Sequence, residues 1–129
     1  MIFEQLIAHL IGDYFLQTDW MAQEKTKRWW PAIVHALSYG LPFLFITHAW
    51  LALIVIVGTH LVIDHWRLAR YVIWFKNLLA PAAYRYQWKD CNITGYHKDR
   101  PAWLTTWLLI ITDNTMHIII NFLAIKYLG

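Results

Sequence analysis

Four long apolar stretches alternate with polar connections along the chain, and each stretch predicts a helix. Residues 29–63 contain no Asp, Glu, Lys or Arg. This run exceeds the roughly 20 residues that one helix needs to cross a bilayer, so we divide it near residues 47–49. The predicted helices then cover about residues 2–17, 29–47, 50–75 and 101–127, and the first of them is the shortest.

Prolines and glycines refine these predictions. Pro31 and Pro101 suit the first turns of the second and fourth helices, where a missing backbone N–H costs nothing. Gly40 and Pro42 are expected to kink the second helix. Gly58 is expected to let another helix pack closely against the third.

Three His–Asp pairs interrupt the apolar stretches, and the two members of each pair are four residues apart. The pairs are His9 with Asp13, His60 with Asp64, and Asp113 with His117. Residues four apart lie on one face of a helix, so the two side chains of a pair can meet. Ionisable groups at membrane depth are costly and usually face the interior of a helix bundle. We therefore expect the pairs, with His35 of the second helix, to converge in one zone of the bundle.

Composition supports a membrane location. Hydrophobic residues make up 59% of the 129 residues and charged residues only 15%, whereas a soluble domain carries about 25% charged residues. Nine tryptophans suit a protein that meets both membrane interfaces. The prediction is an all-α integral membrane bundle of four transmembrane helices, formed by residues 1–129 as a single domain.

The basic residues predict the orientation. Ten of the eleven Lys and Arg residues lie in or beside two connections, residues 18–30 and 77–100; only Lys126 lies elsewhere. By the positive-inside rule, both connections should be cytoplasmic and both termini should lie on the opposite side of a bacterial inner membrane. The N-terminus has neither a basic segment nor a cleavage site typical of a removable signal peptide. Cys91 is expected to be a free thiol.

Mixed imidazole and carboxylate side chains suit a divalent metal, with zinc first and manganese or iron as alternatives. The predicted ligands are His9, Asp13, His60, Asp64 and Asp113. The predicted acid–base partners or further ligands are His35 and His117, and the predicted supporting residues are Gln17 and Asn114. In the competing interpretation the His–Asp pairs only hold the helices together, at around 0.6 kcal/mol per contact. In a third interpretation, the His–Asp pairs conduct protons or ions.

The sequence resembles an uncharacterised family of bacterial and phage inner-membrane proteins, domain of unknown function 3307. The first motif reads HLIGDYFLQ at residues 9–17, followed by DWM at residues 19–21 and by Lys25. His35, the His60–Asp64 pair and the stretch DNTMH at residues 113–117 match the later motifs, with Asn114 where the family has Gln. The resemblance covers the chain except residues 77–100. It implies a membrane location but no established activity.

A weaker likeness to small membrane-bound metal-dependent hydrolases sets the first functional hypothesis. It is a metal-dependent hydrolase acting on a lipid or phosphate ester at the cytoplasmic leaflet. The alternatives are a non-enzymatic phage or bacterial protein that binds a metal or partner and alters the host envelope, and a small proton or metal-ion conduit. The expected partners are the lipid bilayer, that substrate and further copies of the chain, and no nucleic acid.

Overall fold

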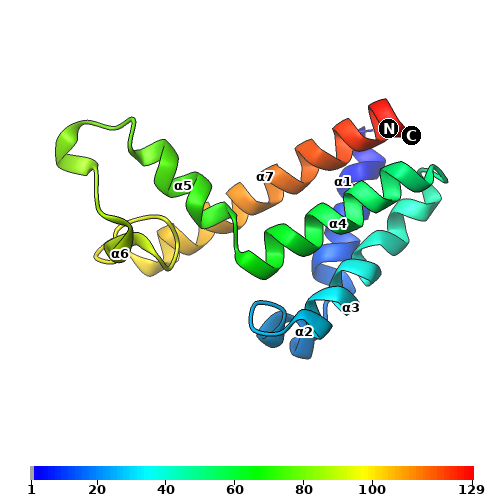
Figure 1. Cartoon of the computed structure of the whole chain (residues 1–129), viewed down its shortest axis with the longest axis horizontal. Coiled ribbons are helices and arrows are strands. Elements are labelled where there is room, and N and C mark those ends of the chain that lie inside the picture. Colours follow the sequence, from blue (N-terminus) through cyan, green and yellow to red (C-terminus); the bar gives the residue numbers. More distant parts are fainter. Residues whose placement is uncertain (1) are drawn as a thin grey trace. The chain divides into compact units, whose positions relative to one another are not determined.

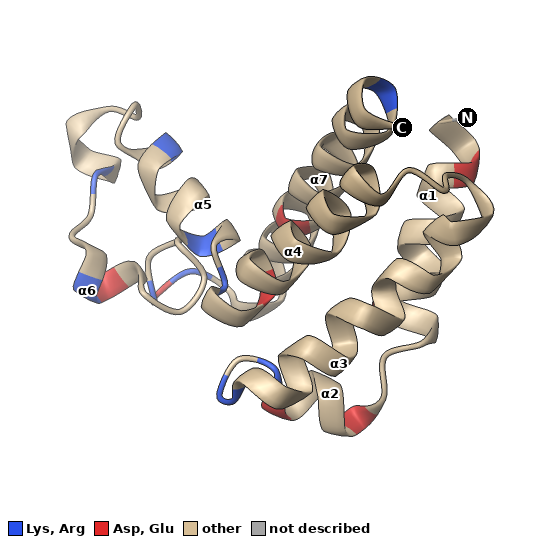
Figure 2. Cartoon of the chain, turned by 45° about the vertical axis from the view of Figure 1, so that its right-hand side comes forward, with Lys and Arg blue, Asp and Glu red and all other residues tan. Residues whose placement is uncertain are grey.

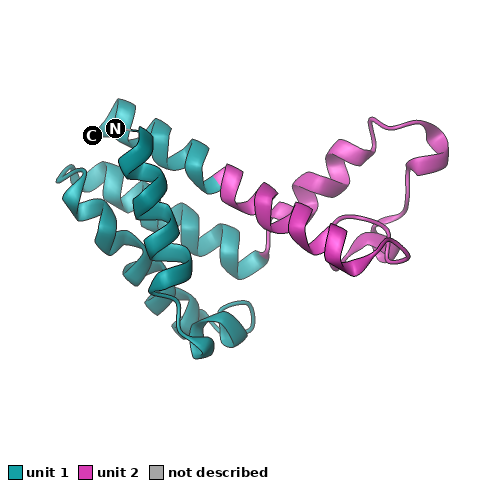
Figure 3. Cartoon of the chain, turned by 180° about the vertical axis from the view of Figure 1, so that it is seen from behind, with its two compact units in different colours: residues 1–66, 117–129 teal, residues 67–116 magenta. Residues whose placement is uncertain are grey.

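The computed structural model describes residues 2–129, which form helices and no strand. This confirms the all-α prediction. The residues group into two compact units, which are coloured separately in Figure 3. Unit 1 comprises residues 2–66 and 117–129, and unit 2 comprises residues 67–116.

Unit 1 contains four α-helices, two short helices of other types and the end of α7 (Figure 1). Its elements are α1 (Ile2–Leu10), the π-helix η1 (Ile11–Phe15), α2 (Asp19–Glu24), α3 (Trp29–Gly40), the 3-10 helix η2 (Leu41–Phe45), α4 (Trp50–Trp66) and the last turns of α7 (Ala102–Leu128). Helix α3 packs along α4, and α1 with η1 packs against α3 and η2. The apolar core is formed by Ala8, Tyr39, Phe43, Leu53, Ile56, Ala124 and Ile125.

The second predicted helix ends where its proline predicts a disturbance. Helix α3 stops at Gly40 and continues as the 3-10 helix η2. Pro42 lies at the start of η2 and has no N–H with which to continue the α-helical ladder. The predicted division near residues 47–49 agrees with the structure, because α4 begins at Trp50.

The third predicted helix, residues 50–75, is not continuous. Helix α4 ends at Trp66, and α5 (Ala69–Asn77) begins after a break. Arg67 has a φ of 53°, in the left-handed region that a continuing helix cannot contain. No proline or glycine lies at this break, so the hydrophobic pattern predicts one continuous helix across it.

Unit 2 contains α5, the 3-10 helix η3 (Ala82–Tyr84), α6 (Trp88–Cys91) and the first part of α7. Two arginines hold its long connection: Arg67 donates to the Ile93 carbonyl at 2.7 Å and Arg70 donates to the Asn92 carbonyl at 2.7 Å. Cys91 is buried, and burial raises the pKa of its thiol, so this free cysteine is poorly suited to act as a nucleophile.

Close helix packing occurs at Gly12 and not at Gly58. A Cβ at Gly12 would lie 2.7 Å from the Tyr39 carbonyl oxygen and 2.9 Å from its ring, so η1 approaches α3 to a distance that only glycine permits. A Cβ at Gly58 would meet nothing within 4 Å in the part of the chain described. The prediction for Gly58 is therefore wrong.

Unit 1 buries several ionisable side chains and exposes several large apolar ones. His9, His35 and His60 are completely buried, whereas Phe45 and Trp50 are 93% and 79% exposed. Charged residues are absent from α3, and α4 has only Asp64 (Figure 2). A soluble protein rarely exposes this much aromatic surface while it buries its ionisable groups.

Helix length supports one span more clearly than four. Helix α7 has 27 residues, its 18-residue window has a mean hydropathy of 1.7, and it is long and apolar enough to cross a membrane by itself. Helix α4 passes the same test only together with α5, across the break at Arg67. The remaining α-helices of unit 1 have 12 residues or fewer.

Candidate metal centre

Three segments of unit 1 bring four ionisable side chains together in its interior. Asp13 comes from η1, His35 from α3, and His60 with Asp64 from α4. One potential ligand atom of each residue lies within 4.8 Å of those of the other three, and all four residues are buried. The helical spacing of His60 and Asp64 puts them on one face of α4, and the tertiary fold brings Asp13 and His35 to the same place.

Local backbone structure directs Asp13 toward the cluster. Residues 11–15 form a π-helical turn, closed by the hydrogen bond from the Leu16 N–H to the Ile11 carbonyl at 2.9 Å. Single π turns within helices are rare and are frequent at functional sites. The predicted pair stays at the limit of contact, with His9 Nε2 4.0 Å from Asp13 Oδ2. Gly12 lets this turn rest directly on α3.

The distances within the cluster suit a tetrahedral metal. His35 Nε2 lies 3.3 Å from Asp13 Oδ1, 3.2 Å from Asp64 Oδ2 and 3.0 Å from His60 Nε2. His60 Nε2 lies 3.4 Å from Asp64 Oδ2 and 3.9 Å from Asp13 Oδ1. Tetrahedral ligands about 2.1 Å from zinc are about 3.4 Å from one another, so the residues present fit such an ion.

The outward-facing ring nitrogens of the two histidines differ from those of most metal ligands. His35 Nδ1 and His60 Nδ1 are buried and have no hydrogen-bond partner among residues 2–129. Metal-bound histidines usually donate this second N–H to an oxygen. The rings are oriented instead by packing: the His60 ring stacks on the Tyr39 ring, with centroids 3.6 Å apart and an interplanar angle of 7°.

A second layer of polar contacts surrounds Tyr39, which is completely buried. The Asn121 side-chain amide donates to the Tyr39 hydroxyl at 2.6 Å, and the hydroxyl is hydrogen-bonded to His9 Nδ1 at 2.9 Å. His9 is therefore a neighbour of the four-residue cluster, held between Tyr39 and Asp13, and lies outside the closest group.

The other residues predicted for the site are His117, Asp113, Asn114 and Gln17. His117 contacts Asp64, with 3.1 Å between Nε2 and Oδ1, so it can orient this carboxylate. Asp113 and Asn114 precede His117 on α7 and belong to unit 2. Gln17 follows η1, and its buried side-chain oxygen has no hydrogen-bond partner in residues 2–129. Among the described residues, no hydrogen bond to this oxygen therefore supports the predicted role of Gln17.

Lys25 belongs to the cluster, and sequence reasoning left it in a polar connection. Its Nζ lies 2.5 Å from Asp64 Oδ2 and 3.3 Å from His35 Nε2. Hydrophobic periodicity could not have found it, because it lies just after the short helix α2. The available signal was its position in the family pattern.

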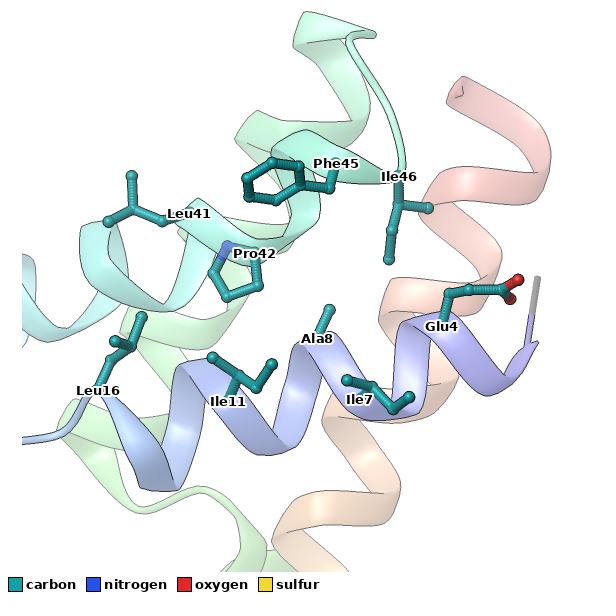
Figure 4. Close-up of a pocket in the computed structure, with 9 residues that line it drawn as sticks. All are labelled: Glu4, Ile7, Ala8, Ile11, Leu16, Leu41, Pro42, Phe45 and Ile46. Carbon is teal, nitrogen blue, oxygen red and sulfur yellow. The ribbon is translucent and has the colours of Figure 1, made fainter.

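Unit 1 also carries an apolar groove between α1 and η2, with a volume of about 450 Å³ (Figure 4). Its nine lining residues are Glu4, Ile7, Ala8, Ile11, Leu16, Leu41, Pro42, Phe45 and Ile46. Glu4 is the only charged residue among them, and none belongs to the four-residue cluster. The groove therefore offers apolar surface and no chemistry of its own.

The fold and the cluster together define a helical protein with a buried His–Asp group that can hold a metal ion. The model of the family described as "Protein of unknown function (DUF3307)" matches residues 1–128, so the chain belongs to this family. No curated protein and no solved structure matches it.

Proposed function

We propose that the chain is a multi-pass protein of the bacterial inner membrane and that its buried cluster binds a divalent metal. The exposed apolar surface of unit 1 supports the membrane location, because exposed Phe15, Phe45 and Trp50 would be stable against lipid and unfavourable in water. In this proposal four helical segments span the bilayer, namely α1 with η1, α3 with η2, α4 and α7, and the connections 18–30 and 77–100 are cytoplasmic.

One observation carries the metal proposal: two imidazoles and two carboxylates converge, from three separate segments, at mutual distances near those of tetrahedral ligands. Hydrogen bonding alone would hold helices together with neutral side chains at a lower desolvation cost. Two nitrogen and two oxygen ligands favour zinc, with manganese and iron as alternatives.

The reaction we propose is hydrolysis of a lipid or phosphate ester at the cytoplasmic leaflet. A bound divalent metal supplies an activated water and polarises the ester oxygen. Asp13, His35, His60 and Asp64 would hold the ion. Because four protein ligands fill a tetrahedral shell, activation of a water would require a fifth coordination position or the release of one of the four residues. His117 would orient Asp64 through its 3.1 Å contact, and His9, hydrogen-bonded to the Tyr39 hydroxyl, would exchange a proton with the neighbouring Asp13.

Metal analysis of the purified protein tests the site itself. We expect about one divalent ion per chain in the wild type, and a loss of the ion in Asp13→Asn and His60→Ala. His48→Ala is a matched control, since His48 is exposed and lies outside the cluster. Equal metal in all four proteins would overturn the proposed site.

Hydrolysis is tested separately, in lipid vesicles that contain the protein and a chromogenic phosphate ester. We expect metal-dependent turnover that falls by about 100-fold or more in Asp13→Asn, because loss of a ligand should cost at least as much as loss of its supporting contacts. Metal binding without turnover of this ester or of the vesicle phospholipids would favour the non-enzymatic alternative.

A conduit is the second candidate, favoured by the continuity of the ionisable groups. Short contacts link Lys25, Asp64, His35 and Asp13 through the interior of unit 1. Chains of this kind mark proton and ion pathways in membranes. A proton or zinc flux into sealed vesicles that is abolished by Asp64→Asn would support the conduit over the hydrolase.

A further inference from the structure

Lys25 places a positive charge against two of the atoms that a metal would need. Its ammonium has only hydrogen-bond donors, and it lies 2.5 Å from Asp64 Oδ2 and 3.3 Å from His35 Nε2. A divalent ion in the proposed site would require the lone pairs of the same two atoms. Two cations this close in a buried environment also repel each other strongly.

We infer that Lys25 is a built-in counter-cation of the site, which neutralises Asp64 in the metal-free protein and is displaced when a divalent ion binds. The inference rests on the proposed metal site and adds a competing group to it. In the metal-free protein the ammonium keeps a buried carboxylate paired, and an unpaired buried charge would be costly.

The structure lets the side chain of Lys25 move while its backbone stays fixed. The Lys25 side chain is 17% exposed, against 5% for the Asp64 side chain, so the lysine enters the cluster from its edge. His65 Nδ1 donates to the Lys25 carbonyl at 2.7 Å, and the His65 ring stacks on Trp29 with centroids 3.8 Å apart. A flexible four-carbon stem on an anchored backbone can swing outward by rotamer changes alone.

The first experiment compares metal affinity in three proteins: the wild type, Lys25→Met, and Lys27→Met as the matched control. The Lys27 side chain is 64% exposed and pairs with Glu24, outside the cluster. We expect Lys25→Met to bind zinc about ten- to a hundredfold more tightly than the wild type, because no charged hydrogen bond has to be broken first. We expect Lys27→Met to bind like the wild type.

The second experiment follows Lys25 in the unaltered chain and does not depend on a variant that folds. Purified protein is treated with an amine-acylating reagent with and without zinc, and acylation at each lysine is measured by mass spectrometry. We expect zinc to increase acylation of Lys25 several-fold and to leave Lys27 unchanged.

The outcomes separate this inference from the proposed function. Zinc binding by the wild type with equal or weaker binding by a folded Lys25→Met would overturn the competition and leave the metal site intact. So would a zinc-bound wild type in which Lys25 stays protected from acylation. An absence of zinc binding in all three proteins would overturn the metal site and the inference together.

Discussion

At the scale of single residues, Asp64 and Tyr39 connect the elements of unit 1. Asp64 Oδ1 contacts His117, and Asp64 Oδ2 contacts His35, His60 and Lys25. Tyr39 contacts His60 with its ring face and binds His9 and Asn121 with its hydroxyl. The contacts of these two side chains therefore connect four elements of unit 1, namely α1, α3, α4 and the end of α7.

Removal of the Tyr39 hydroxyl should weaken the fold without disturbing the ring. In Tyr39→Phe the Asn121 amide and His9 Nδ1 lose a buried partner, which typically costs about 1–3 kcal/mol, whereas the stacking on His60 is kept. We expect a lower midpoint in denaturant unfolding of the detergent-solubilised protein. Tyr127→Phe is the control, because Tyr127 is 70% exposed. Equal midpoints for the two variants would contradict the role assigned to the hydroxyl.

At the scale of elements, the π turn η1 approaches α3 closely at Gly12. Gly12→Ala would place a methyl group 2.7 Å from the Tyr39 backbone oxygen, and a backbone atom cannot yield as a side chain can. Overpacking of this kind usually costs about 1–3 kcal/mol. It should also move Asp13, so we expect Gly12→Ala to lower both the unfolding midpoint and the metal content.

The control for Gly12→Ala is the same substitution in open space. Gly58→Ala meets no described atom within 4 Å, and alanine favours a helix over glycine by up to about 1 kcal/mol. We expect it to keep its metal and to be as stable as the wild type or more stable. A larger loss of stability in Gly58→Ala than in Gly12→Ala would show that the packing of η1 on α3 is misassigned.

The elements also show what the sequence can predict. Helical periodicity correctly put His60 and Asp64 on one face, and the length of the apolar run correctly placed a division just before α4, because these are local properties. The left-handed Arg67 donates a side-chain hydrogen bond to the distant Ile93 carbonyl, and Lys25 reaches the cluster from a turn that has no hydrophobic periodicity. Such features follow from tertiary structure, which a hydrophobic pattern does not record.

At the scale of the whole molecule, the distribution of charge has a direct consequence for topology. Seven of the eleven Lys and Arg residues lie in unit 2, and three more lie together in the turn after α2 (Figure 2). Lys126, near the end of α7, stands alone. If the positive-inside rule applies, both basic groups face the cytoplasm and the end of α7 faces the other side.

Cysteine labelling in intact cells tests this topology. In a Cys91→Ser background, Lys89→Cys and Lys126→Cys each present one thiol at an exposed position. We expect a membrane-impermeant maleimide to label Lys126→Cys in intact cells and Lys89→Cys only after the inner membrane is permeabilised. Both variants remove one positive charge, so they are matched in their effect on the charge bias. Labelling of Lys89→Cys in intact cells would invert the orientation, and it would move the proposed hydrolysis away from the cytoplasmic leaflet. The four-span bundle has one crossing between residues 89 and 126, which puts them on opposite sides of the membrane. Labelling of both positions in intact cells would put them on the same side and would contradict the four-span bundle.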